Sequence, residues 1–221
     1  NKIPVEDPVE YHFANINQMQ VNPGAGVTFA TGLRAIMRLD PDVIMVGEIR
    51  DQDTARIAIQ AGMTGHLIIT TVHAKQAAAV FVRLTEIGVD PHSVASAVTA
   101  VIAQRLVRIL CPQCKRQTPA TPGQEAKLGQ ALTGPTFYAP VGCAACNQKG
   151  FTGRKGVYEI LQVDESVREL IGQRTSPDKL HHTAVAGGMT TMIHNGLRLA
   201  RSGETSLEEV LRILPPEQRG V

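Results

Sequence analysis

Short apolar runs bounded by glycine recur in the first half of the chain. The clearest is Val43–Gly47, which contains no charged residue, and a second lies between Gly65 and Ala74. Runs of this length are typical of strands buried on both faces of a parallel sheet. The pattern therefore predicts two such strands, preceded by a shorter strand within residues 1–11.

Apolar residues at helical spacing fill the intervals between these strands. Thr28 is a predicted N-cap, and Asp51 and Asp90 are expected to cap two later helices. Strands that alternate with helices indicate a parallel sheet with helices on its faces. The predicted helices are one that follows Thr28, then 52–61, 76–87 and a long apolar helix over 91–110.

The carboxyl-terminal part is predicted to be mainly helical. A strand over 156–161 precedes a run of helices, and Asp164 is expected to cap the first of them. Thr205-Ser206-Leu207-Glu208 has the pattern of a capping box for the last helix. The predicted helices are 165–172, 177–186, 189–202 and a short one that ends before Pro215-Pro216.

Polar side chains arrive together where the predicted strands end. Glu48, Arg50 and Asp51 follow the strand at 43–47, and His73 ends the next strand. The carboxyl ends of parallel strands form the ligand-binding edge of an open α/β sheet. A carboxylate delivered there resembles the Walker B segment of a P-loop ATPase, although polar strand ends can also simply meet solvent.

Two further groups are candidates for that edge. Glu6 and Asp7 end the first strand, where a pair of surface acids in a turn is the plainer interpretation. Arg34 and Arg38 lie four residues apart and therefore share one helix face. That face is either solvated or turned toward a phosphate.

Composition sets broad limits on function. The 221 residues are 43% hydrophobic and 19% charged, and the net charge is +2. This balance argues against a strongly basic nucleic-acid surface. No apolar run approaches the roughly 18 to 20 residues that span a bilayer, and there is no signal peptide. Because the first residue is Asn1 rather than Met, we expect the chain to be a piece of a longer protein.

The four cysteines form two pairs, Cys111/Cys114 and Cys143/Cys146, separated by 28 residues. Each Cys-x2-Cys turn directs two thiolates at one ion, and two such turns make a tetrahedral site. A closed four-sulfur site leaves no open position, so we predict a structural role. Zinc is the expected metal, rubredoxin-like iron has the same ligands, and two disulfides are a weaker alternative.

Several motifs occur in order along nearly the whole chain. They are Glu6-Asp7-Pro8-Val9-Glu10, residues 40–51, residues 65–73, Ala103-Gln104-Arg105-Leu106-Val107-Arg108, the paired cysteines and Thr205-Ser206-Leu207-Glu208-Glu209-Val210. Together they resemble the secretion ATPases, which are the hexameric motors of type II secretion and type IV pilus assembly. The four-cysteine lobe is similar to that of the secretion and pilus-extension branch, and both of those functions stay open.

The resemblance implies a role for each matching residue. Glu48 corresponds to the Walker B glutamate, which positions or activates water for attack on the γ-phosphate. Glu6 and Asp7 fall in the family's aspartate box, which organises Mg²⁺ and the attacking water. The remaining matches are His73 and His66 in the histidine box, which links nucleotide state to subunit movement, and Arg34, Arg38 and Arg50 as phosphate-sensing arginines.

One motif of that family is missing. The P-loop pattern Gly-x4-Gly-Lys-[Ser/Thr] occurs nowhere in the chain. Without its backbone N–H groups and lysine the phosphates have no cradle. We therefore expect a carboxyl-terminal part of a motor that by itself binds ATP weakly and hydrolyses little.

The predicted fold class is α/β, a partial RecA-like P-loop ATPase sheet with an inserted zinc lobe and a carboxyl-terminal helical subdomain. The expected domains are a core without Walker A over 1–110, a four-cysteine lobe over 111–155 and helices over 156–221. The resemblance implies ATP, Mg²⁺ and structural Zn²⁺, a homo-hexamer, and a cytoplasmic location at the inner membrane through platform proteins, without nucleic acid. A non-catalytic zinc-ribbon interaction or nucleic-acid module is the alternative, and a DNA-transfer motor would not explain the cysteines.

Overall fold

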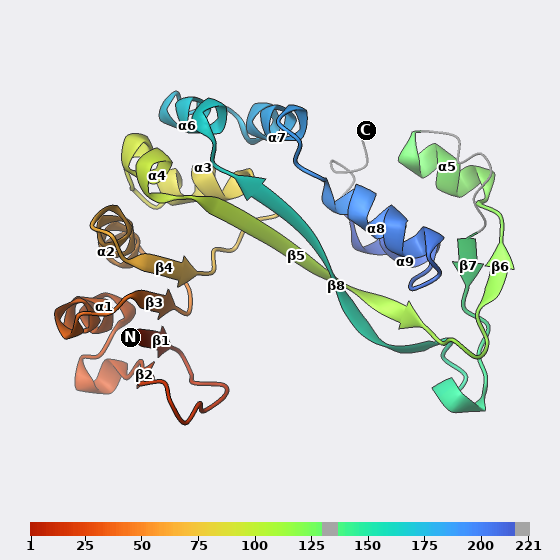
Figure 1. Cartoon of the computed structure of the whole chain (residues 1–221), viewed down its shortest axis with the longest axis horizontal. Coiled ribbons are helices and arrows are strands. Elements are labelled where there is room, and N and C mark those ends of the chain that lie inside the picture. Colours follow the sequence, from red (N-terminus) through yellow and green to blue (C-terminus); the bar gives the residue numbers. More distant parts are fainter. Residues whose placement is uncertain (130–136, 215–221) are drawn as a thin grey trace. The chain divides into compact units, whose positions relative to one another are not determined.

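The computed structural model describes residues 1–129 and 137–214 (Figure 1). Contacts divide the chain into two compact units. The first unit comprises residues 1–101 and 162–184, and the second comprises residues 102–161 and the chain from 185 onward. The chain therefore passes from one unit to the other three times.

A four-stranded parallel sheet with the order β2-β1-β3-β4 forms the centre of the first unit. The register pairs Val5 with Val46, and Val46 with Thr70, so three strands end level at one edge. The predicted α/β class with a parallel sheet is confirmed. The strands are β1 (Lys2–Glu6), β2 (Met19–Gln20), β3 (Val43–Val46) and β4 (Leu67–Thr70).

Side-chain caps set the starts of several helices in this unit. Thr28, Asp51, Asp90 and Asp164 each accept a hydrogen bond from the backbone N–H three residues later, which confirms all four predicted caps. The helical elements are η1 (Pro23–Ala25), α1 (Phe29–Ile36), η2 (Met37–Leu39), α2 (Gln52–Met63), α3 (Ala79–Glu86), α4 (Pro91–Ala97), α6 (Glu165–Gly172) and α7 (Pro177–Ala186).

Among the described residues β1 is buried on both faces, whereas β3 and β4 are covered mainly on one face. Helices α1 and α2 pack against each other and against the strands, over buried residues such as Ile44 and Val46. On the opposite face Met45, Leu67 and Ile69 remain 37%, 54% and 52% exposed. The prediction that these strands are buried on both faces is therefore wrong for this chain.

The long helix predicted over 91–110 is also wrong. Helix α4 ends at Ala97, Val98 is extended at φ −80° and ψ 123°, and the strand β5 (Ala100–Leu110) follows. Exposure alternates along most of β5, as expected for a strand with one covered face. The run is rich in valine and isoleucine, which favour strands, and its polar residues Gln104, Arg105 and Arg108 fit a period of two no better than a helical period.

The second unit packs helices against a ribbon and a small sheet. Strand β5 pairs with β8 (Phe151–Gln162), and β6 (Arg116–Thr118) pairs antiparallel with β7 (Phe137–Ala139). Its core includes Phe137, Val157, Met192 and Leu211. Helices α8 and α9 approach closely at Gly196, where a Cβ would lie 2.9 Å from Val210 Cγ1. The helical elements are α5 (Pro122–Leu128), η3 (Ala144–Cys146), α8 (Met192–Arg201) and α9 (Leu207–Ile213).

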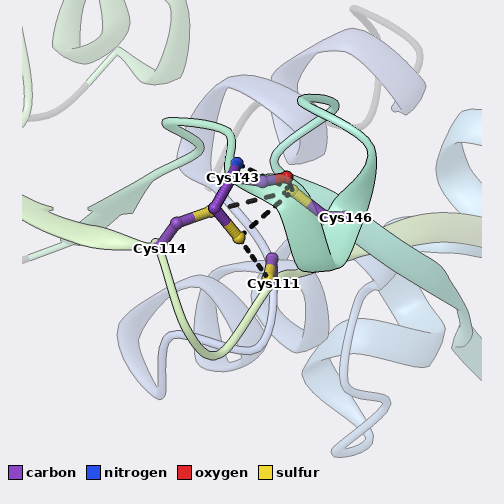
Figure 2. A group of neighbouring side chains, drawn as sticks. All are labelled: Cys111, Cys114, Cys143 and Cys146. Carbon is purple, nitrogen blue, oxygen red and sulfur yellow. Dashed lines mark hydrogen bonds between the residues drawn. The ribbon is translucent and has the colours of Figure 1, made fainter.

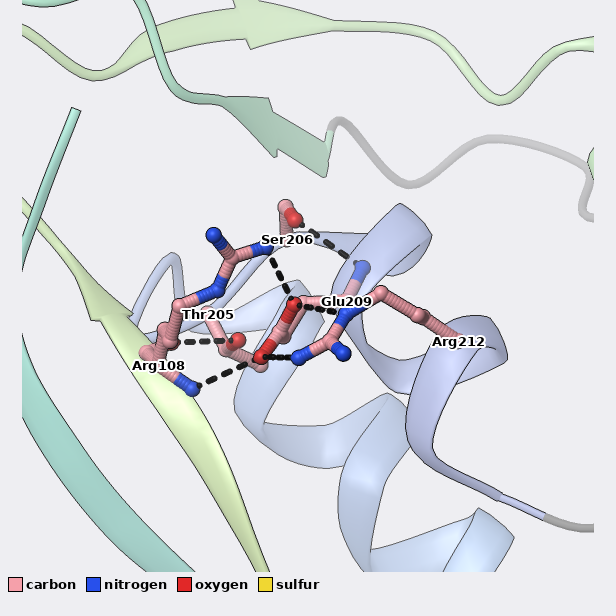
Figure 3. Close-up of polar contacts among 5 residues, drawn as sticks. All are labelled: Arg108, Thr205, Ser206, Glu209 and Arg212. Carbon is pink, nitrogen blue, oxygen red and sulfur yellow. Dashed lines mark hydrogen bonds and ion pairs between the residues drawn. The ribbon is translucent and has the colours of Figure 1, made fainter. Parts of the chain in front are cut away.

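A buried carboxylate joins α9 to β5 (Figure 3). The Glu209 side chain is fully buried and accepts hydrogen bonds from Arg108 Nη2 at 2.7 Å, Arg212 Nε at 2.9 Å and Arg212 Nη2 at 2.8 Å. The Arg108 backbone N–H also donates to it at 3.1 Å. Burial opposes the charged form, but the hydrogen bonds from Arg212 and Arg108 outweigh it and lower the pKa of Glu209 to about 2.

The start of α9 differs by one residue from the predicted capping box. Ser206, not Thr205, is the N-cap, and its Oγ accepts from the Glu209 backbone N–H at 3.1 Å. Thr205 Oγ1 instead donates to the Arg108 carbonyl at 2.8 Å. The predicted stop at Pro215-Pro216 lies outside the described residues.

The two contact units follow different boundaries from the three expected segments. Residues 162–184 group with the parallel sheet, because α6 packs against α4 and the Arg168 Nε donates to the Ala95 carbonyl at 2.8 Å. The three-domain scheme 1–110, 111–155 and 156–221 stays a prediction about folding units.

Candidate functional site

Backbone hydrogen bonds carry the parallel ladder beyond the ends of the strands. The Gly47 N–H donates to the Val5 carbonyl at 2.8 Å, and the Ile49 N–H donates to the Thr71 carbonyl at 3.1 Å. Thr71 Oγ1 donates to the Gly47 carbonyl at 2.7 Å. A Cβ on Gly47 would lie only 3.3 Å from the Val5 carbonyl oxygen, so a small residue suits this position. The segments that follow β1, β3 and β4 are thereby held side by side.

Glu48 lies at this edge between the side chains of Arg50 and His73. One carboxylate oxygen is 2.5 Å from Arg50 Nη2, and the other is 3.4 Å from His73 Nε2. The Glu48 side chain is 14% exposed, whereas those of Arg50 and His73 are 66% and 86% exposed. The hydrogen bond that Arg50 donates to Glu48, together with the charge of Glu48, raises the pKa of Arg50. The contact with His73 is an ion pair only when the imidazole is protonated.

The acids of β1 reach the same edge. Gln18 Nε2 donates to Glu6 Oε1 at 3.0 Å and so orients that carboxylate. The charge of Asp7 also raises the pKa of Arg50, although less than Glu48 does. The structure therefore brings together five of the residues selected from the sequence: Glu6, Asp7, Glu48, Arg50 and His73.

His66 lies at the other end of the sheet. It precedes β4, and its Nδ1 is 3.1 Å from the Ala61 carbonyl and 3.3 Å from Thr64 Oγ1. Along the strand this is six residues from the level of Glu48, or roughly 20 Å. In this chain His66 joins the end of α2 to β4 and is not close to Glu48.

Arg34 and Arg38 are also far from the carboxyl edge. Helix α1 starts beside it, since Phe29 lies near Gly47, and then runs back toward the amino ends of the strands. There Asn1 Nδ2 donates to the Leu39 carbonyl at 3.1 Å. The expectation that these two arginines meet Glu48 at one edge is wrong within this chain. Both side chains are exposed, and a phosphate-sensing role for them stays a prediction.

Two residues of this edge were missed from the sequence. Thr71 links β4 to Gly47, and Gln18 orients Glu6 from the segment just before β2. No local pattern marks either residue, because each acts through a contact with another part of the chain. The chemistry of the edge is that of a carboxylate flanked by donors, which suits positioning of a water molecule or a cation.

The four cysteines converge in the second unit (Figure 2). The Sγ atoms of Cys111 and Cys143 are 3.9 Å apart, those of Cys114 and Cys146 are 3.9 Å apart, and those of Cys143 and Cys146 are 3.8 Å apart. All four atoms lie within 4.8 Å of one another. Sulfur atoms about 2.3 Å from a tetrahedral zinc ion lie about 3.8 Å apart. The four free thiols therefore fit one metal ion.

Backbone geometry shapes the second pair of cysteines for this purpose. Asn147 and Gln148 are left-handed at φ 50° and 62°, which turns the chain back after Cys146. The N–H groups of Cys143 and Gly150 then donate to Cys146 Sγ at 3.3 Å and 3.2 Å. Gly150 has φ 73°, and a Cβ there would lie 2.5 Å from Pro140 Cβ. Glycine is therefore required where the chain leaves this turn.

Burial and these backbone N–H donors shift the pKa values of the thiols. Burial opposes ionisation of Cys146, but the two backbone N–H groups outweigh it and lower the pKa of the thiol to about 6. Burial dominates at Cys114 and raises its pKa to about 11. Metal binding requires thiolates, so Cys146 is the ligand that is best prepared.

No helix within residues 1–129 and 137–214 is long and apolar enough to cross a membrane.

Comparison with known proteins gives a consistent result. The family model described as "Type II/IV secretion system protein" matches residues 1–212. The chain is 44% identical to the type II secretion system protein E of Pseudomonas aeruginosa over 98% of its length and 43% of that protein. It is 45% identical to the type IV pilus assembly ATPase PilB of Thermus thermophilus, over 96% of the chain and 24% of PilB. The chain thus spans less than half the length of these relatives.

Solved structures share the fold. The pilus retraction motor PilT with bound ADP matches with a TM-score of 0.67 and 27% identity, over 96% of this chain and 51% of PilT. The ATPase DotB of Legionella pneumophila matches with a TM-score of 0.64 over 95% of this chain and 50% of DotB, and at 20% identity it supports the fold alone. With a family match that covers nearly all of its residues, the chain belongs to the type II/IV secretion system protein family.

Proposed function

We propose that this chain supplies part of the catalytic domain of a hexameric motor ATPase that powers type II protein secretion or type IV pilus assembly. The observation that carries the proposal is the position of Glu48 at the carboxyl edge of the parallel sheet, between Arg50 and His73 and beside the acids of β1. Ligands of open α/β sheets bind at this edge. The names of the relatives, which include ATPases, agree with it.

In this proposal Glu48 orients or deprotonates the water that attacks the γ-phosphate. Glu6 and Asp7 hold Mg²⁺, directly or through its water ligands. Arg50 stabilises charge on the phosphate oxygens, and His73, which is the most exposed of the group, senses the nucleotide at the subunit surface. The phosphate-binding loop that this chemistry needs is not among residues 1–221.

The four-cysteine site is proposed to hold a structural zinc ion. A closed set of four sulfur ligands leaves no position for substrate, so the ion would stabilise its lobe and take no part in hydrolysis. Arg34, Arg38 and His66 lie away from Glu48 of their own subunit. A role for them in nucleotide sensing therefore requires a neighbouring subunit of the ring.

The proposed setting is the cytoplasmic face of the inner membrane, where the hexamer acts on platform proteins of the secretion or pilus machinery. The relatives named for type II secretion and type IV pilus assembly support such partners. The chain itself would be held at the membrane by these proteins.

Replacement of Glu48 tests the catalytic part of the proposal. In the full-length protein that carries this chain, Glu48→Gln is expected to lower kcat for ATP hydrolysis by at least about 100-fold, because the amide cannot accept a proton from water. Nucleotide affinity should be retained, since the substitution keeps the shape of the side chain. Steady-state hydrolysis and equilibrium binding of a fluorescent ATP analogue measure the two effects.

A matched control is Arg201→Gln, which changes an exposed residue at the end of α8 and should leave kcat unchanged. Retention of most of the hydrolysis rate by Glu48→Gln would contradict the proposed role. Residues 1–221 alone should hydrolyse ATP slowly, and a rate close to that of the full-length protein would overturn the need for a separate phosphate-binding loop.

A further inference from the structure

A cavity of about 500 Å³ lies in the first unit, beside α2. Its lining comes from α2, the turn between α3 and α4, the start of α4 and the turn after α6. None of the residues at the carboxyl edge contributes to it. The volume falls within the roughly 300 to 1,000 Å³ of small-molecule sites.

Two arginines face this cavity without a protein partner. Arg56 comes from α2 and Arg174 from the turn after α6. Within residues 1–129 and 137–214 neither guanidinium forms a hydrogen bond or an ion pair. A guanidinium presents a planar set of donors that matches phosphate or carboxylate oxygens. Both arginines are exposed residues and line the same concave site, one from α2 and one from the turn after α6.

Arg174 occupies a backbone position that suits glycine better. Helix α6 ends with the Thr175 N–H bonded to the Leu170 carbonyl and the Arg174 N–H bonded to the Ile171 carbonyl. This is a Schellman ending, in which the left-handed residue is usually glycine. Arg174 has φ 55° and pays the steric cost of a Cβ there. The chain therefore carries a guanidinium at a backbone position where glycine would fit with less strain.

The other walls are polar at one end and apolar at the other. Asp90 Oδ2 accepts from Ser93 N at 2.9 Å and from Ser93 Oγ at 3.2 Å. The backbone N–H of Ser93 lowers the pKa of Asp90, which keeps it ionised. Met63 and Val89 supply apolar surface. Two arginines against one aspartate leave a net positive charge in the cavity.

The walls are fixed relative to one another before any ligand binds. Arg168 Nε on α6 donates to the Ala95 carbonyl of α4 at 2.8 Å. Gln52 Nε2 on α2 donates to the Gly88 carbonyl at 3.1 Å, in the turn that lines the cavity. A preformed site loses little entropy on binding.

From these observations we propose that the cavity is a binding site for a small phosphate-bearing anion. Arg56 and Arg174 hold the phosphate oxygens from two sides. The Asp90 carboxylate accepts from a hydroxyl or amine of the ligand, and Met63 and Val89 contact its apolar part. The site is separate from the hydrolytic edge at Glu48, so its ligand would act as an effector.

Nuclear magnetic resonance of the ¹⁵N-labelled chain tests this site directly. Titration with inorganic phosphate, and separately with adenosine 5′-monophosphate, should give saturable amide shifts at Arg56, Gly88, Asp90 and Arg174. A tighter apparent Kd for the nucleotide indicates an organic phosphate that uses the apolar wall, and equal Kd values indicate a free anion. Both results support the site.

The variants separate binding from structure. Arg56→Gln and Arg174→Gly should each weaken phosphate binding at least fivefold, because each removes charge-assisted hydrogen bonds, and the double variant should abolish it. Arg174→Gly should at the same time raise Tm by about 1–3 °C, since glycine tolerates the left-handed turn. Arg201→Gln is the matched control and should leave Kd unchanged. Absence of saturable shifts, shifts confined to the Glu48 edge, or unchanged binding in the double variant would overturn the proposal.

Discussion

Removal of metal from the four-cysteine site is expected to unfold residues 111–150 and to leave the parallel sheet folded. The lobe has little apolar core of its own near the cysteines, and metal binding to such a site contributes about 10 kcal/mol or more of folding free energy. Chelation should therefore abolish amide hydrogen-exchange protection in 111–150, while β1, β3 and β4 keep theirs. Exchange monitored by mass spectrometry resolves the two regions.

Substitutions sharpen this prediction. Cys146→Ser removes the thiol with the lowered pKa and should release the metal, with the same local loss of protection. Gln113→Ser lies between two ligands of the same site and is the matched control, expected to keep one equivalent of metal. Elemental analysis of the reduced protein provides the direct measurement. Less than about half an equivalent of zinc or iron would count against a four-thiolate site.

Loss of both arginines around Glu209 is expected to destabilise the second unit by about 3–5 kcal/mol at pH 7. In Arg108→Met/Arg212→Met the carboxylate stays buried but loses three of its four hydrogen bonds. Methionine preserves much of the apolar contact, including that of Arg108 over the Phe151 ring. Urea unfolding in a Tyr11→Phe background, followed by the fluorescence of Tyr138 and Tyr158, measures the change in the second unit.

A third substitution identifies the buried charge as the cause. Adding Glu209→Gln to the double variant should recover part of the lost stability, because a neutral amide costs less to bury than an unpaired carboxylate. Arg201→Met removes an exposed arginine from the same unit and should change stability little. Further destabilisation on adding Glu209→Gln would contradict this account.

The same network predicts how stability depends on pH. The pKa of Glu209 is about 2 when folded, below its ordinary value of 4.5. Ionised Glu209 therefore adds about 3 kcal/mol to the free energy of unfolding above pH 4.5, and this stabilisation is lost as the pH falls through about 2. Without the arginines, burial should raise this pKa, so the unfolding free energy of the double variant should fall as the pH rises through the new value. The unfolding free energy should thus change with pH in opposite directions in the unaltered protein and in the double variant. This difference separates the effect of Glu209 from that of the other acidic residues.

Local patterns in the sequence account for much of the fold because their causes are local. Thr28, Asp51, Asp90 and Asp164 cap their helices as predicted, since a cap bonds only to a backbone N–H three residues away. Helices 165–172 and 177–186 were predicted with the bounds that the structure has. Residues 98–110 were misread as helix because their apolar positions follow no clear period, and tertiary packing decided for the strand.

Some features of the candidate site could likewise be predicted from the sequence, and others could not. Cysteine spacing alone predicted one four-sulfur cluster, and strand order alone placed Glu6, Asp7, Glu48 and His73 at one edge, because parallel strands must end together. Sequence could not show that α1 carries Arg34 and Arg38 away from that edge, since this depends on where the helix packs. The pairing of Glu209 with Arg108, 101 residues apart, and the cavity between Arg56 and Arg174 also exist only once distant segments meet.

The sequence by itself thus determined four helix caps, the parallel sheet, the convergence of the four cysteines and the place of Glu48 at the end of its strand, since each follows from residue type and short-range spacing. Only the tertiary structure decided that one face of β3 and β4 stays exposed and that Glu48 is held between Arg50 and His73. It also decided that Glu209 is buried with its charge. These features depend on packing and electrostatic contacts between residues that no local pattern connects.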